Sequence, residues 1–518
     1  MARCLIFTLI LAAHGSEIQV VSNDFSFAMV NHATGLAECW GDVKYGGDCS
    51  AVDFAGVLQV KANSRSMAVL TSTGGSCWGY AAYGGDCSTQ GLSGMTELHS
   101  TDLSYLAFDA VGKRGTCWGH SSYGGSCGTI DFSQVTKISS NKYAYVAYSA
   151  STQTLQCWGS SSYGGNCEAS AFTGSSLGEV TELIASIGAF VAFDRTAGTI
   201  TCWGSSAYGG DCSSVTLTGI TEVYTNGNAF VALNKNSGLG QCWGGSGGDC
   251  SGIDFSGDVQ IYSTQSAFLA WKSGSGHCWG DLTRGGNCSA VNWASVKQIY
   301  SNDYAFLALD SSGVAQCWGL EGYGGNCEVG NLDGFEIYSS STVFAAINSI
   351  TGVGHCWGQE AYGGSCSTLD FTGVTDVWAN SRAFLAVDRN LQGQAWGASA
   401  QGADVSGVNF PQVLTMPTTV TPTTTPATTT LAPTVPPTTE LPSTSSTSSA
   451  SGQCMFICHW FMRSNRFKSR FCGMDFCSGC EECHSQDEGS QTTTTVELPV
   501  CSEVCKQYKG SAANGGWM

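Results

Sequence analysis

The residues best suited to chemistry in this 518-residue chain are its 27 cysteines, and eighteen of them recur as pairs. In nine copies a cysteine stands directly before a Trp-Gly dipeptide, and a second cysteine follows ten residues later, or eight in one copy. Cysteines at short spacing serve thiol redox exchange, metal binding or disulfide formation. The pairs are Cys39 with Cys49, Cys77 with Cys87, Cys117 with Cys127, Cys157 with Cys167, Cys202 with Cys212, Cys242 with Cys250, Cys278 with Cys288, Cys317 with Cys327, and Cys356 with Cys366.

A tenth copy of the motif favours disulfide formation over redox exchange and metal binding. It has Ala395 before Trp396 and Val405 ten residues after Ala395, so both cysteines are absent together. A bonded pair predicts this joint loss, whereas two independent thiols would not vanish as a unit. We therefore predict nine structural disulfides, each closing a loop of about 11 residues and contributing roughly 2.5–3 kcal/mol by constraining the unfolded chain.

The other polar residues give no catalytic set. The recurring carboxylates precede the second cysteine, at a position where Asp, Asn and Ser interchange, which is turn chemistry; they are Asp48, Asp86, Asp211 and Asp249. The eight histidines share no repeat position, and no Gly-x-Ser-x-Gly, His-Glu-x2-His or phosphate-loop pattern is present. We predict no catalytic residue, no metal site and no cofactor, and hence a protein that is not an enzyme.

A tyrosine recurs directly before a Gly-Gly pair between the two cysteines. The residues are Tyr45, Tyr83, Tyr123, Tyr163, Tyr208, Tyr323 and Tyr362. One interpretation is a circular array of aromatic side chains on one face, which would bind sugar rings or loops of a partner protein. The alternative is structural, with each tyrosine packed over its own disulfide or over the next repeat's tryptophan.

These motifs lie on a unit that repeats ten times. The Trp-Gly pairs start at residues 40, 78, 118, 158, 203, 243, 279, 318, 357 and 396, and a period near 40 residues indicates units that bury their core by stacking. Within one unit, 296–300, 305–309 and 314–319 are short apolar runs rich in β-branched and aromatic residues, separated by turn residues. A fourth short strand is expected after the glycine turn, as at 52–54, 130–132, 253–255 and 369–371. Three or four antiparallel strands per unit predict an all-β fold, a β-propeller of about ten blades.

The two ends of the array predict that the ring is closed. The first repeat begins at 18–20 without a preceding Val-Asp-Phe segment, and the last continues into 408–414, which matches 52–58. We expect the C-terminal segment to supply the missing strand and remove both open edges. One ten-bladed ring is favoured, with an open or split array as the alternative.

The repeat resembles a known family. The order Ala-Phe-x-Ala-Leu, apolar strand, Trp-Gly and glycine-rich turn resembles repeats of the regulator of chromosome condensation superfamily over roughly residues 17 to 414. Its short-repeat secreted branch, which includes a propeller-type inhibitor of β-lactamases, is the closer likeness. The family's usual Gly-Gln-Leu-Gly turn is here Tyr-Gly-Gly-Asp-Cys, and intracellular members lack these cysteines. The resemblance implies a propeller fold, and this departure argues against nucleotide-exchange activity.

Composition and flanking segments indicate where the protein acts. Residues 1–15 have a basic start, a short apolar run and small residues for cleavage, which is typical of a signal peptide. The propeller is assigned to 16–416 and is followed by a Thr/Ser/Pro-rich, mucin-like linker carrying O-glycan acceptors at 417–451. A cysteine-rich module at 452–507 is a disulfide unit or a zinc site helped by His459 and His484, and 508–518 is a flexible tail. Within that module, a basic run near Arg466 suits an anionic polysaccharide, a membrane surface or simply solvent.

The sequence predicts a binding function outside the cell. A formal net charge of −19 disfavours nucleic acid as a partner, no membrane span is expected, and we expect a monomer. The leading hypothesis is a secreted recognition protein that binds extracellular glycans or proteins, with association to a cell surface or cell wall left open. The alternatives are an inhibitor of a secreted enzyme and an enzyme with its site in the central channel.

Overall fold

The computed structural model describes residues 18–167 and 179–415. The signal peptide, the linker, the cysteine-rich module and the tail expected at 1–15, 417–451, 452–507 and 508–518 lie outside the described residues. Within the described ranges, no helix combines the length and the apolar character needed to cross a membrane.

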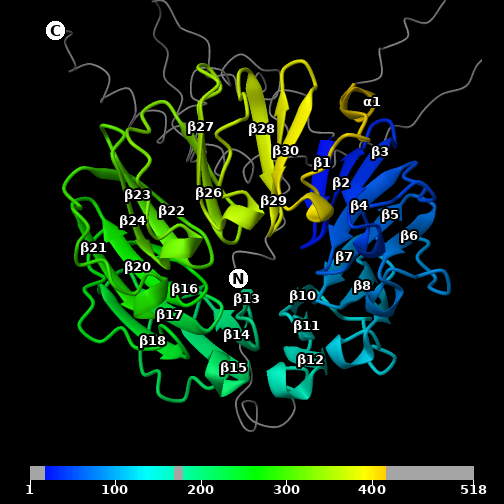
Figure 1. The fold of residues 1–518 in the computed structure, drawn as a ribbon. Coiled ribbons are helices and arrows are strands. Elements are labelled where there is room, and N and C mark those ends of the chain that lie inside the picture. Colours follow the sequence, from blue (N-terminus) through cyan, green and yellow to red (C-terminus); the bar gives the residue numbers. More distant parts are fainter. Residues whose placement is uncertain (1–17, 168–178, 416–518) are drawn as a thin grey trace, which may run out of the picture. The chain divides into compact units, whose positions relative to one another are not determined.

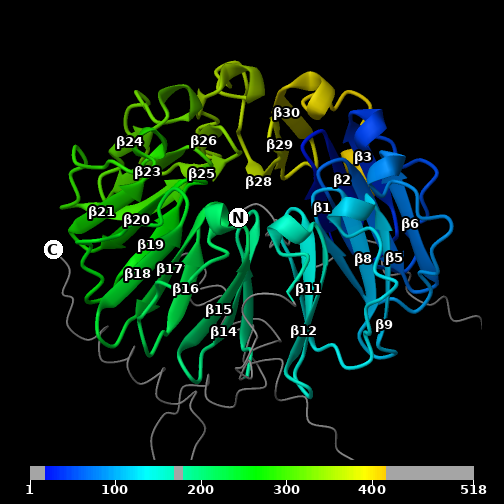
Figure 2. The same cartoon turned by 90° about the horizontal axis from the view of Figure 1, so that it is seen from below.

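Ten three-stranded antiparallel sheets follow one another around a ring, so the protein is a β-propeller (Figures 1 and 2). We number the blades 1 to 10 in chain order. The first strands are β1 (Ile18–Ser22), β4 (Val57–Ala62), β7 (Glu97–Ser100), β10 (Lys137–Ser140), β13 (Glu182–Ala185), β16 (Glu222–Thr225), β19 (Gln260–Ser263), β22 (Val296–Ser301), β25 (Glu336–Ser339) and β28 (Val374–Ala379). The second strands are β2 (Ser26–Asn31), β5 (Ser66–Thr71), β8 (Ser104–Asp109), β11 (Ala144–Ser149), β14 (Ala189–Asp194), β17 (Ala229–Asn234), β20 (Ala267–Lys272), β23 (Ala305–Asp310), β26 (Val343–Ile347) and β29 (Ala383–Asp388). The third strands are β3 (Ala37–Gly41), β6 (Gly74–Gly79), β9 (Arg114–Gly119), β12 (Thr154–Gly159), β15 (Thr199–Gly204), β18 (Leu239–Gly244), β21 (Ser275–Gly280), β24 (Ala315–Gly319), β27 (Gly354–Gly358) and β30 (Gly393–Gly397).

The second strand of each blade forms the buried centre of the fold. Its Ala-Phe-x-Ala sequence is buried between neighbouring sheets, as with Phe306, which is 0% exposed. First strands of most successive blades, such as β4 and β7, contact one another, which makes them the innermost strands. The third strand, with the Cys-Trp-Gly sequence, is therefore at the outer edge.

The repeated tryptophan joins each blade to the one before it. Its ring lies opposite the aromatic residue of the second strand, as in the stacked pair Tyr145 and Trp158 at 5.0 Å. In eight of the ten blades the indole Nε1 donates to the carbonyl of the first turn glycine of the preceding blade, for example Trp158 to Gly124 at 3.2 Å. All ten tryptophans are core residues, and eight of them satisfy their one donor between blades, whereas the N–H groups of Trp357 and Trp396 are buried without a hydrogen-bond partner.

The segment expected to form a fourth strand does something else. Residues 52–54 and their equivalents pair with no strand, and each sheet has three strands. The aromatic residue of the segment packs edge-on against the tryptophan of the next blade, as Phe54 does on Trp78 at 5.5 Å. The expectation of a fourth strand is therefore wrong, because the segment packs between neighbouring blades and does not join a sheet.

The ring closes through the C-terminal segment, though not by strand pairing. Residues Phe410–Leu414 form the short helix α1, which packs on β2 and β3 beside blade 10 (Figure 1). The side chain of Asn31 donates to the carbonyl of Val413 at 2.8 Å, and Trp40 donates to Gly402 at 3.2 Å. The array is thus one ring of ten blades, as favoured, with a helix in place of the expected closing strand.

Disulfides close the outer turn of nine blades, and all eighteen predicted cysteines take part. Each bond lies within one repeat, with Cα atoms 5.6 to 5.8 Å apart. The pairing is the one that the spacing predicts. The bonds join Cys39 to Cys49, Cys77 to Cys87, Cys117 to Cys127, Cys157 to Cys167, Cys202 to Cys212, Cys242 to Cys250, Cys278 to Cys288, Cys317 to Cys327, and Cys356 to Cys366.

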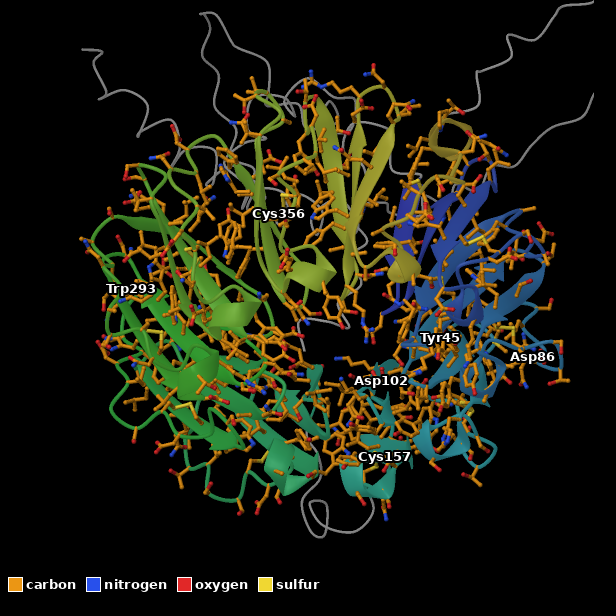
Figure 3. The ribbon with its side chains drawn as sticks, in the orientation of Figure 1. Tyr45, Asp86, Asp102, Cys157, Trp293 and Cys356 are labelled. Atoms are coloured by element: carbon orange, nitrogen blue, oxygen red, sulfur yellow. A yellow bond between two sulfur atoms is a disulfide. The ribbon has the colours of Figure 1, made fainter. Side chains whose placement is uncertain are left out.

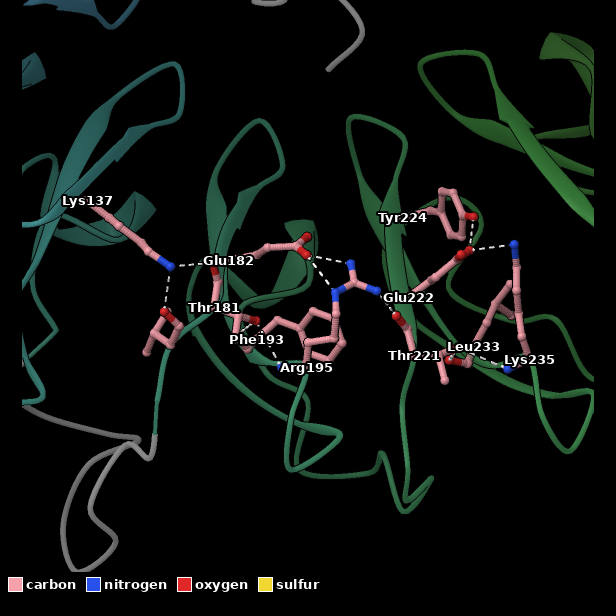
Figure 4. A network of polar contacts seen from close by, with 11 residues as sticks. Lys137, Thr181, Glu182, Phe193, Arg195, Thr221, Glu222, Tyr224, Leu233 and Lys235 are labelled. Atoms are coloured by element: carbon pink, nitrogen blue, oxygen red, sulfur yellow. Dashed lines mark hydrogen bonds and ion pairs between the residues drawn. The ribbon is translucent and has the colours of Figure 1, made fainter. Parts of the chain in front are cut away.

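Polar contacts hold neighbouring blades together at both ends of the inner strands. At one end, the first hairpin turns of blades 2 to 8 each donate a backbone N–H to the carbonyl of the next blade's turn at 2.9–3.4 Å, in a series that runs from Ser64 to Ser341. At the other end, Lys137 donates to the carbonyls of Val180 and Thr181, and Arg195 pairs with Glu182 and reaches the next blade (Figure 4). The first series forms a collar that fixes the hairpin turns relative to one another.

Candidate functional site

The seven tyrosines predicted from the repeat lie at the ends of short 3-10 helices on one face of the ring. Nine of the third strands are followed by such a helix, and seven of the nine helices end in a tyrosine. They are η2 (Val43–Tyr45), η3 (Ala81–Tyr83), η4 (Ser121–Tyr123), η5 (Ser161–Tyr163), η6 (Ser206–Tyr208), η7 (Leu282–Arg284), η8 (Glu321–Tyr323), η9 (Glu360–Tyr362) and η10 (Ser399–Gln401). Each of the seven tyrosines is partly buried.

The two glycines after each tyrosine are required by the turn. The first, for example Gly124, has φ +94°, and a Cβ on it would lie 2.5 Å from the Tyr145 ring of the next blade. The second, Gly125, would place a Cβ 2.5 Å from the carbonyl oxygen of Gly119. The Tyr-Gly-Gly sequence thus lets the turn lie flat against the neighbouring blade.

In nine of the ten blades, blade 9 being the exception, a buried polar residue attaches the outer turn to the first hairpin of the same blade. In blade 2, Asn63 Oδ1 accepts from the backbone N–H groups of Arg65 and Ser66 at 2.9 and 2.8 Å. Its Nδ2 donates to the carbonyl of Tyr83 at 2.6 Å. Equivalent contacts are made by Asn23, Thr101, Asn141, Ser186, Asn226, Thr264, Asn302 and Asn380. This residue therefore brings the tyrosine turns next to the hairpins at the ring centre.

On one side of the ring, side chains from the turns and the hairpins form a continuous series of ring contacts. We call this the aromatic arc, and its members are Phe25, Tyr45, Tyr80, Tyr83, His120, Tyr123, Tyr143, Tyr163 and Tyr208. Successive ring centroids are 4.3 to 6.1 Å apart. The arc spans blades 1 to 5, so five of the seven predicted tyrosines lie together.

The other two tyrosines stand apart from these direct ring contacts. Tyr323 contacts Tyr304 at 4.7 Å in blade 8, and Tyr362 joins the arc only through Arg382, whose guanidinium is 5.3 Å from its ring. Blade 6 interrupts the series because its turn is two residues shorter and carries no tyrosine. The predicted circular array is therefore an arc in this structure.

Two arginines lie on the aromatic arc. The guanidinium of Arg65 is 5.4 Å from the Tyr45 ring and 5.9 Å from the Tyr83 ring. That of Arg382 lies 5.0 Å from the Phe25 ring, across the point where the ring closes. Cations over aromatic faces are held in place without losing their hydrogen-bond donors.

A hollow of about 320 Å³ opens beside these arginines. Its lining includes Arg65, Arg382, Asp24, Asp102 and Tyr143. Figure 3 places Asp102 close to the centre of the ring, whereas Asp86 is at the outer edge. The volume is at the lower end for ligand pockets, which suits a single sugar ring or one side chain.

Burial sets the electrostatics of the hollow. It raises the pKa of Asp102 above its ordinary value, against the attraction of Lys142 Nζ at 3.7 Å. It also raises the pKa of Tyr143 to about 12, with a smaller contribution from the nearby Asp102 carboxylate. At neutral pH the tyrosine is a hydroxyl donor and acceptor beside an ion pair.

The disulfides and the recurring aspartates are at the outer edge, away from the arc. Asp86 accepts from the backbone N–H of Ser88 at 2.9 Å, which lowers the pKa of Asp86. Asp48, Asp211 and Asp249 do the same with their own serines. Across 18–167 and 179–415, no three His, Cys, Asp or Glu residues gather in a way that would hold a metal ion.

Several residues of this site were not found from the sequence. Phe25, Arg65, Tyr143 and Arg382 occupy one position of the first hairpin, where the residue type changes from repeat to repeat. The sequence does carry a signal for this position, which stands two residues after the repeated buried polar residue and varies from copy to copy. The variation becomes visible only when the repeats are aligned on the buried polar residue.

Comparisons with known proteins find only loose structural likenesses and no site. The sequence matches no protein-family model and no curated protein. Among solved structures it is similar to the ectodomain of the receptor kinase CR4 from Physcomitrella patens, with 16% identity over 62% of this chain and 74% of that one and a TM-score of 0.31. The CRINKLY WD40 ectodomain of the Arabidopsis thaliana receptor kinase ACR4 is 16% identical over 51% of this chain and 95% of its own, at a TM-score of 0.30. Prp20p of Saccharomyces cerevisiae is 12% identical over 62% and 79%, at a TM-score of 0.27.

These likenesses are loose. Prp20p is the yeast RCC1, a member of the superfamily that the repeat resembles. At TM-scores near 0.3, neither the number of blades nor a binding surface can be inferred from these structures. The ten-bladed ring therefore rests on this chain's own strand pairing. The resemblance to a secreted branch and to a β-lactamase inhibitor stays a prediction.

Proposed function

We propose that this protein is a secreted, non-catalytic recognition protein that binds glycans or proteins through the aromatic arc. The observation that carries the proposal is the gathering of nine partly exposed rings on one side of one face, next to a hollow at the ring centre. Tyrosine supplies a broad apolar face together with a hydroxyl, at a small entropic cost of ordering. Such surfaces are suited to stacking on sugar rings or on side chains of a partner.

The stability of the scaffold supports a role outside the cell. Nine disulfides within the described ring are typical of proteins made in an oxidising compartment. The expected signal peptide and mucin-like linker point the same way. The collar and the disulfides also hold the arc rigid, which reduces the entropy lost when a ligand binds.

The proposal is tested with the full-length protein on a glycan array. We expect wild type to bind a subset of glycans, and the triple variant Tyr83→Ala, Tyr123→Ala, Tyr163→Ala to bind them at least about tenfold more weakly. The matched control is Tyr323→Ala, which removes a tyrosine from the same turn position outside the arc. Equal binding by wild type and the triple variant would contradict the proposal.

A further inference from the structure

The arginines of the arc differ from three other arginines of the described ring in having no acid partner. Arg114, Arg195 and Arg284 each lie within 4 Å of a carboxylate oxygen. Neither Arg65 nor Arg382 has an ion pair with any described residue, although both line the same hollow. The one hydrogen bond from the Arg65 guanidinium goes to the Tyr45 hydroxyl at 3.3 Å. Most of their planar donor sets are therefore free for an oxyanion.

The charges around the hollow leave room for one anion. Two arginines and two aspartates line it, and Lys142 pairs with Asp102 at 3.7 Å from just beyond. The lining itself is formally neutral, with two cations and two carboxylates. Because Lys142 pairs with Asp102 from outside the lining, the two arginines are left with the carboxylate of Asp24, and an anion can pair with the second arginine. In a chain with formal net charge −19, such a site is an exception.

We propose that the hollow binds the carboxylate of an acidic sugar residue, such as a hexuronic or sialic acid. This inference rests on the proposed function and names the ligand class for the same surface. Arg65 and Arg382 would hold the carboxylate through charge-assisted hydrogen bonds. Tyr83 and Tyr143 offer ring faces beside it, and the volume of about 320 Å³ accommodates one sugar ring.

The aspartates in the hollow favour a sugar over an acidic peptide. Asp24 and Asp102 present carboxylate oxygens next to the arginines, and such oxygens need donors when a ligand displaces water. An acidic sugar brings several hydroxyl donors together with its carboxylate and its flat face. The side chain of a glutamate or aspartate brings the carboxylate alone and would place it beside two carboxylates with nothing to donate.

The test compares acidic sugars with their neutral counterparts on the full-length protein. Matched pairs are glucuronic acid and glucose, galacturonic acid and galactose, and sialyllactose and lactose, each titrated by calorimetry at constant salt. We expect at least one acid to bind about tenfold or more tightly than its neutral partner, and Arg65→Gln and Arg382→Gln to abolish that preference. The control is Arg284→Gln, which also removes an arginine stacked on a tyrosine of this face but leaves the hollow intact.

The possible results separate this inference from the function on which it rests. Equal affinity for acidic and neutral sugars, still dependent on the arc tyrosines, would overturn the carboxylate site and leave the recognition function standing. Binding of a poly-glutamate peptide in place of sugars, lost in Arg65→Gln, would overturn the sugar assignment. Absence of binding to every acidic sugar would overturn the carboxylate site, and the recognition function would then stand or fall with the glycan array and its triple tyrosine variant.

Discussion

Each repeat contributes two turns to the same face of the ring. One is an outer turn, closed by a disulfide in nine blades, and the other is an inner hairpin near the ring centre. The outer turns are nearly identical in sequence: nine keep both cysteines, and all keep the glycine that follows the 3-10 helix position. The inner hairpins keep only the buried polar residue and differ in the two residues after it, such as Ser64-Arg65 and Lys142-Tyr143.

The difference follows from what each turn must satisfy. In an outer turn the disulfide, the positive φ of the glycine and the tryptophan hydrogen bond all constrain the same few residues. In an inner hairpin the collar uses backbone groups, so the side chains are free to vary. Stability is therefore concentrated where the repeats agree, whereas the arc combines recurring tyrosines of the outer turns with hairpin residues that differ from repeat to repeat.

The largest expected effect comes from removing an outer disulfide. Cys77→Ala with Cys87→Ala should lower the free energy of unfolding by about 2.5–3 kcal/mol, because the unfolded chain regains the freedom of a loop of about 11 residues. The measurement is the urea unfolding midpoint. Sugar affinity should also fall, because this disulfide closes the turn that carries the arc residue Tyr83. The matched double variant Cys317→Ala, Cys327→Ala opens the Tyr323 turn outside the arc and should lose as much stability but keep its affinity. Equal losses of affinity in the two double variants would contradict the arc.

The buried asparagine joins the two turns, so its removal should affect both properties. Asn63→Ala leaves backbone groups of Arg65, Ser66 and Tyr83 without their partner and should cost about 1–3 kcal/mol of stability. It should also weaken ligand binding, because it loosens the hairpin that carries Arg65. Urea unfolding and calorimetry measure the two effects separately.

Blade 8 offers a matched control for this prediction. Asn302 makes the same contacts, with Nδ2 donating to the Tyr323 carbonyl at 2.8 Å, but lies outside the arc. Asn302→Ala should lose as much stability as Asn63→Ala and keep full affinity. Equal losses of affinity in the two variants would show that the ring responds as a whole and that the arc has no special part.

The repeat allowed most of the fold to be predicted. The pairing of Cys77 with Cys87 and the core position of Trp78 follow from spacing alone, since every copy is a separate observation of the same unit. The C-terminal helix was missed for a local reason. Asn409 caps the helix by accepting from the N–H of Gln412, and Pro411 has no N–H for a strand ladder, so residues 410–414 form a helix where their counterparts do not.

The candidate site could be predicted only in part. Five arc tyrosines were named because they recur, but Arg382 and Phe25 are neighbours only after the ring closes, and no spacing along the chain records that contact. Arg65 and Tyr143 stand at a position that varies and leave no periodic signal. A repeat reveals what its copies share, so the residues that make this propeller different had to come from the structure.

The smallest expected effect is a difference in pH dependence between the two kinds of turn. The backbone and side chain of Ser88 lower the pKa of Asp86, so its contribution to stability is present above about pH 4 and is lost as the pH falls through the folded-state pKa. Burial raises the pKa of Asp102, so the fold favours its protonated form, and stability declines as the pH rises through that pKa. Asp86→Asn should flatten the stability profile below pH 4, whereas Asp102→Asn should remove a decline above pH 4. Urea midpoints from pH 2 to 7 measure both, and profiles that change in the same direction would show that the inner and outer carboxyls are not electrostatically distinct.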